Sequence, residues 1–168
     1  MSNYDAFLKI DGIEDESEDA KHGKEIQLSS FTWGSSQPGT FGAGGGGGGG
    51  KVSFQDFHFT KELSKATLKL KVFHNSGKHI PKATLTLRKA TGSGGQQDYY
   101  KITFEDVLIS SYSASGTGST GGPVPTESWS MAFTKYEEEY FVQDKGGKLA
   151  SAGTVNWDVK KNDGSKPS

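Results

Sequence analysis

The sequence predicts an all-β domain, either an antiparallel barrel or a sandwich. Seven or eight segments alternate apolar and polar residues, and a period of two is typical of a strand with one buried face. Glycine- and serine-rich stretches at 39–50, 91–97 and 113–125 separate several of these segments, as connections between strands do. The alternation also slips by one residue in places, which indicates the bulges of curved, closing sheets.

The predicted strands follow one another along most of the chain. The segment 51–60 interrupts its apolar alternation at Asp56, and the segment 99–113 slips at Glu105 and Asp106. Because an extra residue shifts the alternation by one position, we expect a bulge at both places. The full set of predicted strands is 4–10, 25–33, 51–60, 82–90, 99–113, 127–142 (which contains two runs) and 154–161.

One segment, SKATLKLKVFHNSGK, fits two structures. Its residues LKLKV alternate between apolar and charged side chains, as in a strand. The same segment has Ser64 where a helix N-cap would stand, Ala66, Leu70 and Phe73 at helical spacing, and Gly77 as a stop. Periodicity alone therefore leaves helix and strand open for residues 64–75.

Seven consecutive glycines end at Gly50 and are followed by Lys51, which matches the first part of a P-loop, G-x-x-x-x-G-K. The next residue, Val52, lacks the hydroxyl that would bind magnesium, and a strand-like segment follows instead of a helix. We therefore reject a nucleotide site. Ordering a glycine run costs on the order of 1 kcal/mol or more per residue, so we expect it to be mobile in an isolated subunit. Fully extended it spans roughly 23 Å, enough to reach beyond its own domain.

The composition excludes several classes of protein. The 168 residues suit one domain, and 19 Lys+Arg against 20 Asp+Glu leave a net charge of -1 without the basic excess of a nucleic-acid-binding protein. The absence of cysteine excludes disulfides and thiolate metal sites. No apolar run approaches the ~20 residues that span a bilayer. The first residues lack the basic and apolar regions of a secretory signal.

No pattern in the sequence indicates an active site. The segment from Asp11 to Asp19 holds six carboxylates without the spacing of an EF-hand, so we interpret it as a solvated acidic loop. No G-x-S-x-G nucleophile elbow occurs. We predict no catalytic, metal-binding or cofactor-binding residues. One enzyme alternative, a metal hydrolase, would use histidines that lack metal-site spacing: His22, His74 and His79.

Five segments in collinear order resemble the haemolysin-coregulated protein (Hcp) family, the tube proteins of bacterial type VI secretion. They are EIQLSSFTWGSSQPG, the glycine run leading into KVSFQDFHFTKELSKAT, SGKHIPKATLTLRKA, ITFEDVLISSYSASG, and FTKYEEEYFVQ with TVNWDVK. The resemblance implies a curved two-sheet antiparallel β-barrel with one flanking α-helix at about 64–75 and extended glycine-rich loops. It also implies one domain over 1–160, followed by a polar, flexible tail over 161–168. Lys69 and Lys71 depart from an all-round apolar helix and leave its packing face open.

The resemblance also implies a structural function and not an enzymatic one. We expect a homohexameric ring that stacks into a hollow secreted tube, with sheath and spike proteins as partners and effector proteins in the lumen. We expect no nucleic acid, cofactor or membrane insertion. The protein is expected in the cytoplasm when made and then outside the cell without a cleavable signal peptide. A phage-tail-like tube protein would be expected to have the same fold and ring assembly. The alternative class is a monomeric β-sandwich module that binds a carbohydrate or peptide.

Two groups of residues are predicted to serve assembly and transport. Ser30 and Thr32 point opposite to Phe31 and Trp33 by strand alternation, and we predict that they face the channel. The other interpretation is an ordinary outward-facing strand position, because alternation gives the face of a strand and not what lies beyond it. The glycine run is predicted to contact a neighbouring subunit or the next ring, the other interpretation being a tolerated hairpin tip. The residues of this inter-subunit or inter-ring loop are Gly44, Gly45, Gly46, Gly47, Gly48, Gly49, Gly50 and Lys51.

Overall fold

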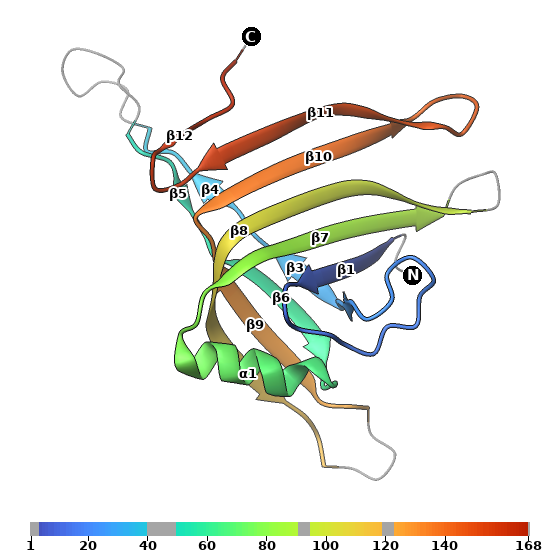
Figure 1. Ribbon diagram of the computed structural model, residues 1–168, viewed down its shortest axis with the longest axis vertical. Helices are drawn as coiled ribbons and strands as arrows, with labels where there is room; N and C mark the ends of the chain where they lie inside the picture. The colour runs from blue at the N-terminus through green and yellow to red at the C-terminus, as the bar shows by residue number, and fades with distance from the viewer. Residues whose placement is uncertain (1–3, 40–49, 91–94, 119–122, 168) are drawn as a thin grey trace.

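The computed structural model describes residues 4–39, 50–90, 95–118 and 123–167. Two curved antiparallel sheets meet along one strand, and a helix lies against one side (Figure 1). The elements in chain order are β1 (Asp5–Ile10), β2 (Ile26–Gln27), β3 (Ser30–Thr32), β4 (Ser35–Ser36), β5 (Ser53–Phe54), β6 (Phe57–Glu62), α1 (Ala66–Ser76), β7 (Ile80–Ala90), β8 (Gln96–Ser115), β9 (Thr126–Ala132), β10 (Lys135–Gln143), β11 (Leu149–Asp158) and β12 (Asp163–Gly164).

The long strand β8 belongs to both sheets. Its first half pairs with β7 and β10 in the first sheet, whose order is β12-β11-β10-β8-β7-β1-β2. Its second half pairs with β9 in the second sheet, which continues through β6 to β3. The change of partner follows Asp106, which has a left-handed backbone with φ of 51°. The predicted irregularity at this point of the strand is therefore confirmed, and it is where one strand passes between the two sheets.

The two sheets approach each other again at the start of the second one. The amide of Leu28 donates to the carbonyl of Ala6 in β1 at 2.9 Å, and the next amide, Ser29, donates to Thr60 in β6 at 2.8 Å. Consecutive residues thus bond to different sheets, which forms a second corner. The predicted curved two-sheet antiparallel fold is confirmed, although the ladders of the described residues do not close into a complete barrel.

The core lies between the sheets and uses the apolar faces that alternation predicts. Phe57 and Phe59 of β6, with Trp129 and Met131 of β9, are at most 1% exposed. The facing strands of the first sheet contribute fully buried residues, among them Leu85, Ile102 and Phe104.

The segment that the sequence left open is a helix, as the family resemblance implied. Ala66 and Leu70 are fully buried against the core, and Gly77 ends the helix with φ of 67°. Leu68 and Val72 are 73% and 64% exposed, so half of the aliphatic side chains on α1 face outward. The strand-like alternation fails here because it would bring Leu68 and Leu70 to the same face, whereas only Leu70 reaches the core.

The described residues on either side of the glycine-rich segment form a short two-stranded stem. β4 and β5 pair through Ser35 with Phe54 and Ser36 with Ser53. The ring of Phe54 packs against Tyr136 at 5.4 Å between centroids, which anchors the stem on the first sheet. The predicted break at Asp56 is confirmed, because it separates β5 from β6. At the far end of the chain, β12 pairs with β11 within the segment predicted as a tail.

Candidate functional site: a hydroxyl-lined face of the second sheet

The outer face of the second sheet carries two rows of polar side chains, all of which bear a hydroxyl except His58. Because side chains directly opposite each other in a ladder share a face, the register defines both rows. The first row crosses four strands as Ser30, Thr60, Ser128 and Ser113, and the second as Thr32, His58, Ser130 and Ser111. We call these eight residues the hydroxyl face.

Hydrogen bonds connect the hydroxyls across the strands. The Ser30 and Thr60 hydroxyl oxygens lie 2.6 Å apart, and Ser130 is bonded to the hydroxyls of both Ser110 and Ser111. Ser110 also donates to a carboxylate oxygen of Asp56 at 2.7 Å. Ser110 is the extra residue where the register between β8 and β9 shifts, so this bulge places an additional hydroxyl beside the second row.

The hydroxyl face points away from the core because alternate residues of the same strands point into it. In β9, Trp129 is 1% exposed, while its neighbour Ser128 is exposed. Ser130 is the buried member of the face, at 2% exposed, and it is hydrogen-bonded to the exposed Ser110 and Ser111. Glu127 is one of the β9 residues that point toward the core, and it accepts a hydrogen bond from Thr67 of α1. The helix therefore packs on the core side of this sheet. The hydroxyl face and α1 therefore lie on opposite sides of the second sheet.

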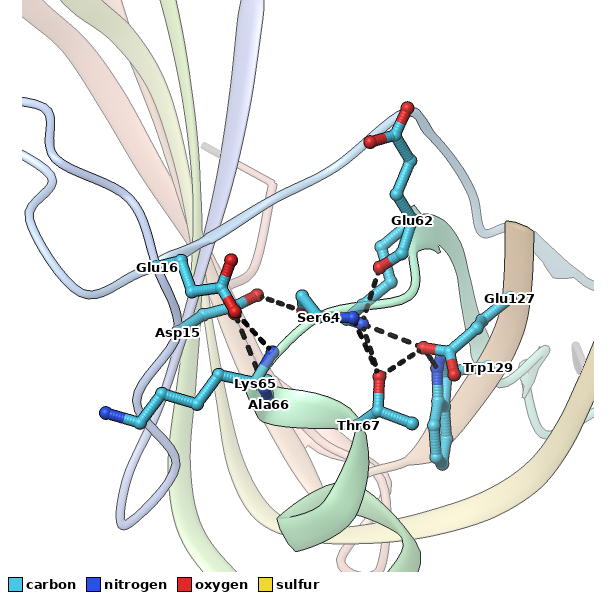
Figure 2. A network of polar contacts seen from close by, with 10 residues as sticks. Asp15, Glu16, Glu62, Ser64, Lys65, Ala66, Thr67, Glu127 and Trp129 are labelled. Carbon is cyan, nitrogen blue, oxygen red and sulfur yellow. Dashed lines mark hydrogen bonds and ion pairs between the residues drawn. The ribbon is translucent and has the colours of Figure 1, made fainter. Parts of the chain in front are cut away.

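A buried ion pair holds α1 against the inner side of this sheet (Figure 2). The ammonium nitrogen of Lys61 lies 2.8 Å from the carboxylate of Glu127, and the two side chains are 1% and 0% exposed. The same carboxylate oxygen accepts from the hydroxyl of Thr67 at 2.8 Å and from the indole N–H of Trp129 at 3.3 Å. Because the ammonium also donates to Thr67 and to the carbonyl of Glu62, its charge is compensated without water.

The acidic segment is docked on the fold, which corrects its interpretation as a solvated loop. Asp15 is only 8% exposed and accepts hydrogen bonds from Ser64 and from the first amide of α1 (Figure 2). Carboxylates at this position satisfy free amides and complement the positive end of the helix dipole. The carboxylate of Asp19 lies 2.7 Å from the guanidinium of Arg88 on β7. Backbone donation by Lys21 and the ion pair with Arg88 lower the pKa of Asp19 to about 2.

His22 continues this docking. It stacks on Phe7 with ring centroids 4.5 Å apart, and its two ring nitrogens lie 2.8 Å from Glu25 and 2.9 Å from Asp98. Burial opposes the charge, but hydrogen bonds to Asp98 and Glu25 outweigh it, so the pKa of His22 is raised above its ordinary value. We call residues 11–25 the acidic strap. Asp19 pairs with Arg88 of β7 and His22 pairs with Asp98 of β8, and these two contacts hold the strap on the sheet.

The other histidines lie apart from His22. His74 bonds the carbonyl of Ile109 and His79 bonds the carboxylate of Asp106, so the three histidines of the metal-hydrolase alternative do not converge. Across the described ranges, no group of three His, Cys, Asp or Glu side chains has the arrangement of a metal site. In the same ranges, no helix is long and apolar enough to span a membrane.

The structure brings together some of the predicted site residues. Ser30 and Thr32 are both exposed on β3 and begin the two hydroxyl rows. Of the predicted loop, Gly50 and Lys51 are described and exposed, while Gly44 to Gly49 lie outside the described residues. Sequence reasoning missed the partners of Ser30 and Thr32 on the other strands. Their signal was present in the alternating hydroxyls of TESWSMA and SSYSAS.

Comparisons with known proteins agree with this architecture. A family model described as "Type VI secretion system effector, Hcp" matches residues 7–140. Protein hcp1 of Pseudomonas aeruginosa is 40% identical over 159 residues, which cover 94% of this chain and 96% of that protein. The structure of a type six secretion system protein has a TM-score of 0.86 at 29% identity and covers 96% of this chain and 99% of its own. Hcp1 from Salmonella typhimurium has a TM-score of 0.77 at 36% identity, with 97% and 99% covered.

The fold and these relatives define a structural protein of bacterial secretion. More particularly, the chain belongs to the Hcp family of the type VI secretion system, whose members are tube components that associate with copies of themselves and are secreted. This is a structural family and not one known for enzyme activity. A monomeric binding module is not favoured by these relatives.

Proposed function

We propose that copies of this chain form a hexameric ring whose channel is lined by the hydroxyl face. The observation that carries this proposal is the alignment of two polar rows across all four strands of one sheet, on the side opposite α1. Ser30 and Thr32, which alternation places on the face opposite to Phe31 and Trp33, then line this channel. Stacked rings form the tube, and the proposed partners are sheath and spike proteins outside it and effector proteins inside it.

The chemistry of the hydroxyl face suits passage of cargo. Serine and threonine hydroxyls both donate and accept hydrogen bonds, so they can exchange a hydrogen bond with water for one with the surface of a passing protein. Many of these hydroxyls already form hydrogen bonds with one another, which limits how strongly they bind any one polar group of the cargo. A face with few ionised groups also exerts little long-range attraction or repulsion on cargo of either charge.

The absence of native cysteine allows a direct test of the channel assignment. Ser113→Cys would place a thiol on the hydroxyl face, and Lys69→Cys would place one on the exposed side of α1. In assembled rings we expect a small maleimide to label both variants and a maleimide joined to a globular protein to label only Lys69→Cys. After unfolding in urea, both thiols should react with the large reagent. Equal labelling by the large reagent in intact rings would contradict the channel assignment.

The ring itself is tested by the mass in solution. Light scattering on the wild-type chain should give about six times the monomer mass of 18.0 kDa. A monomer at micromolar concentration would contradict the proposal of a stable ring.

The predicted loop from Gly44 to Gly50 with Lys51 remains a proposed contact to the neighbouring subunit or the next ring. It is supported by the anchored stem of β4 and β5, which holds both ends of the loop together. Amide hydrogen exchange measured in single rings and in stacked tubes tests this contact. We expect slower exchange across the loop in tubes, and equal exchange in both states would exclude a contact between rings.

A further inference from the structure

One end of the fold contains a groove of about 760 Å³ between the acidic strap and the corner where the sheets meet. Its apolar residues are Phe7, Leu28 and Leu63, of which Leu63 is 49% exposed. Its polar rim is made mainly of carboxylates: Asp15, Glu16, Glu18, Asp19, Glu25 and Glu62. We call this feature the acidic groove. Arg88 is the cation among its lining residues.

The structure neutralises only part of this negative charge. Asp19 pairs with Arg88, Glu25 pairs with His22, and Asp15 caps α1. Within the described ranges, no ion pair involves Glu16, Glu18 or Glu62, and all three side chains are exposed. Of these, Glu16 already accepts a hydrogen bond from the amide of Lys65 at 3.0 Å. Two carboxylates beside an exposed leucine therefore form a surface that suits a cationic segment with an aliphatic portion.

A segment of this kind lies on the opposite flank of the molecule. Residues 159–162, which we call the basic turn, connect β11 to β12 and carry Lys160 and Lys161. The turn is held to the fold by the amide of Val159, which donates to Thr134 at 2.7 Å. In Figure 1 it lies at the left, beyond the arrowhead of β11 and below the label β12, whereas the blue acidic strap lies at the right.

Both lysines of the basic turn are available to a partner. The Lys160 side chain is 73% exposed, and its ammonium nitrogen is 3.7 Å from Asp106, a distance that leaves its other donors free. Lys161 is exposed and takes part in no ion pair among the described residues. Lys160 and Lys161 line a surface depression together with Lys135 and His79. The carboxylates of Asp158 and Asp106, which pair with Lys135 and His79, and that of Glu105 line it too.

We propose that the basic turn of one copy occupies the acidic groove of the next copy around the ring. Both surfaces belong to the same chain and lie on opposite flanks, which is the condition for a head-to-tail contact that closes under rotation. The ammonium groups of Lys160 and Lys161 face Glu18 and Glu62, while their aliphatic portions cover Leu63. This inference rests on the proposed ring and assigns the contact that closes it.

Charge reversal tests the contact on each side separately. The variant Glu18→Lys with Glu62→Lys changes the groove, and Lys160→Glu with Lys161→Glu changes the turn. In light scattering, each double variant should fall from about six copies to one, because the altered charges repel at every junction. The four substitutions combined should restore the ring, because each junction again joins opposite charges and the net charge returns to that of the wild type.

Mixing the two double variants gives an independent readout. The unchanged turn of one fits the unchanged groove of the other, and the reversed surfaces also match, so an equimolar mixture should form rings in which the two variants alternate. The matched control is Lys145→Glu with Lys148→Glu, which reverses two exposed lysines in the connection from β10 to β11 and should leave the ring intact.

The outcomes separate this inference from the proposed function. Rings that persist in both double variants would overturn the contact while the ring itself stands. Loss of rings without restoration in the combined variant would also overturn the pairing of these two surfaces. A monomeric wild-type chain would overturn the ring and this contact with it.

Discussion

The two faces of the second sheet are built by the same strands and have opposite chemistry. In β6 and β9, inward residues form an aromatic core and a buried ion pair, whereas their immediate neighbours form the hydroxyl face. The inner face holds α1 and the first sheet together, and the outer face is the proposed lining of the channel. Strand alternation thus lets a single sheet separate stability from function, so substitutions on the two faces should differ in kind as well as in size.

The largest effect is expected from Glu127→Ala on the inner face. The substitution leaves the ammonium of Lys61 buried and unpaired, and it removes the acceptor of Thr67 and Trp129. We expect the free energy of unfolding in urea to fall by about 3–5 kcal/mol. As a control, Lys61→Met combined with Glu127→Leu removes both charges and should recover most of this loss. A double variant as unstable as the single one would show that the charge itself is not the cause.

Met131→Ala is expected to lower the free energy of unfolding by a similar amount, over a wider expected range. Met131 is fully buried between Phe57 of β6 and Ile109 of β8 in the register of the sheet. Removing most of its side chain leaves a cavity, and the free energy of unfolding should fall by about 2–5 kcal/mol. A loss below about 1 kcal/mol in urea unfolding would mean that this part of the inner face relaxes to fill the space.

A change in pH should have a smaller effect on the free energy of unfolding. This effect should come from the acidic strap and not from the hydroxyl face. The folded-state pKa of His22 is raised above 6.5. Its contribution to stability is therefore complete below pH 6.5 and is lost as the pH rises through the raised value. Urea unfolding across pH 5 to 9 should show a decline that His22→Gln flattens. An unchanged decline in the variant would assign the pH dependence to another group.

The smallest effect is expected from Ser128→Ala on the hydroxyl face. Ser128 is exposed, and its inward neighbours Glu127 and Trp129 keep all their contacts. The free energy of unfolding should change by no more than about 0.5 kcal/mol, and the ring should persist in light scattering. Destabilisation comparable to that of Met131→Ala would show that the two faces do not divide stability from function.

Local patterns in the sequence were sufficient for most of the strands. Among the described residues, eight strands have three or more residues, in agreement with the seven or eight predicted. Of the two-residue strands, β2 and β5 lie inside predicted segments, whereas β4 and β12 were missed. The interruptions at Asp56 and at Asp106 were also visible in the alternation. These features could be read directly because the side-chain period of a strand depends only on neighbouring residues.

Features that depend on distant residues required either the family resemblance or the structure. Helix α1 forms although apolar and polar residues alternate along it, because Leu70 and Ala66 are buried by strands far away in the sequence. The acidic strap is docked because Arg88 and Asp98 meet it across the first sheet. Neither partner could be identified from spacing along the chain.

The sequence by itself determined where most strands lie, which of their residues point inward, and that Ser30 and Thr32 point away from the core. Only the tertiary structure decided that these two residues begin rows that continue through β6, β9 and β8. The physical reason is that alternation is a property of one strand, whereas the register that aligns Ser30 with Ser113 is set by three successive ladders. Each ladder is positioned by the packing of the whole core.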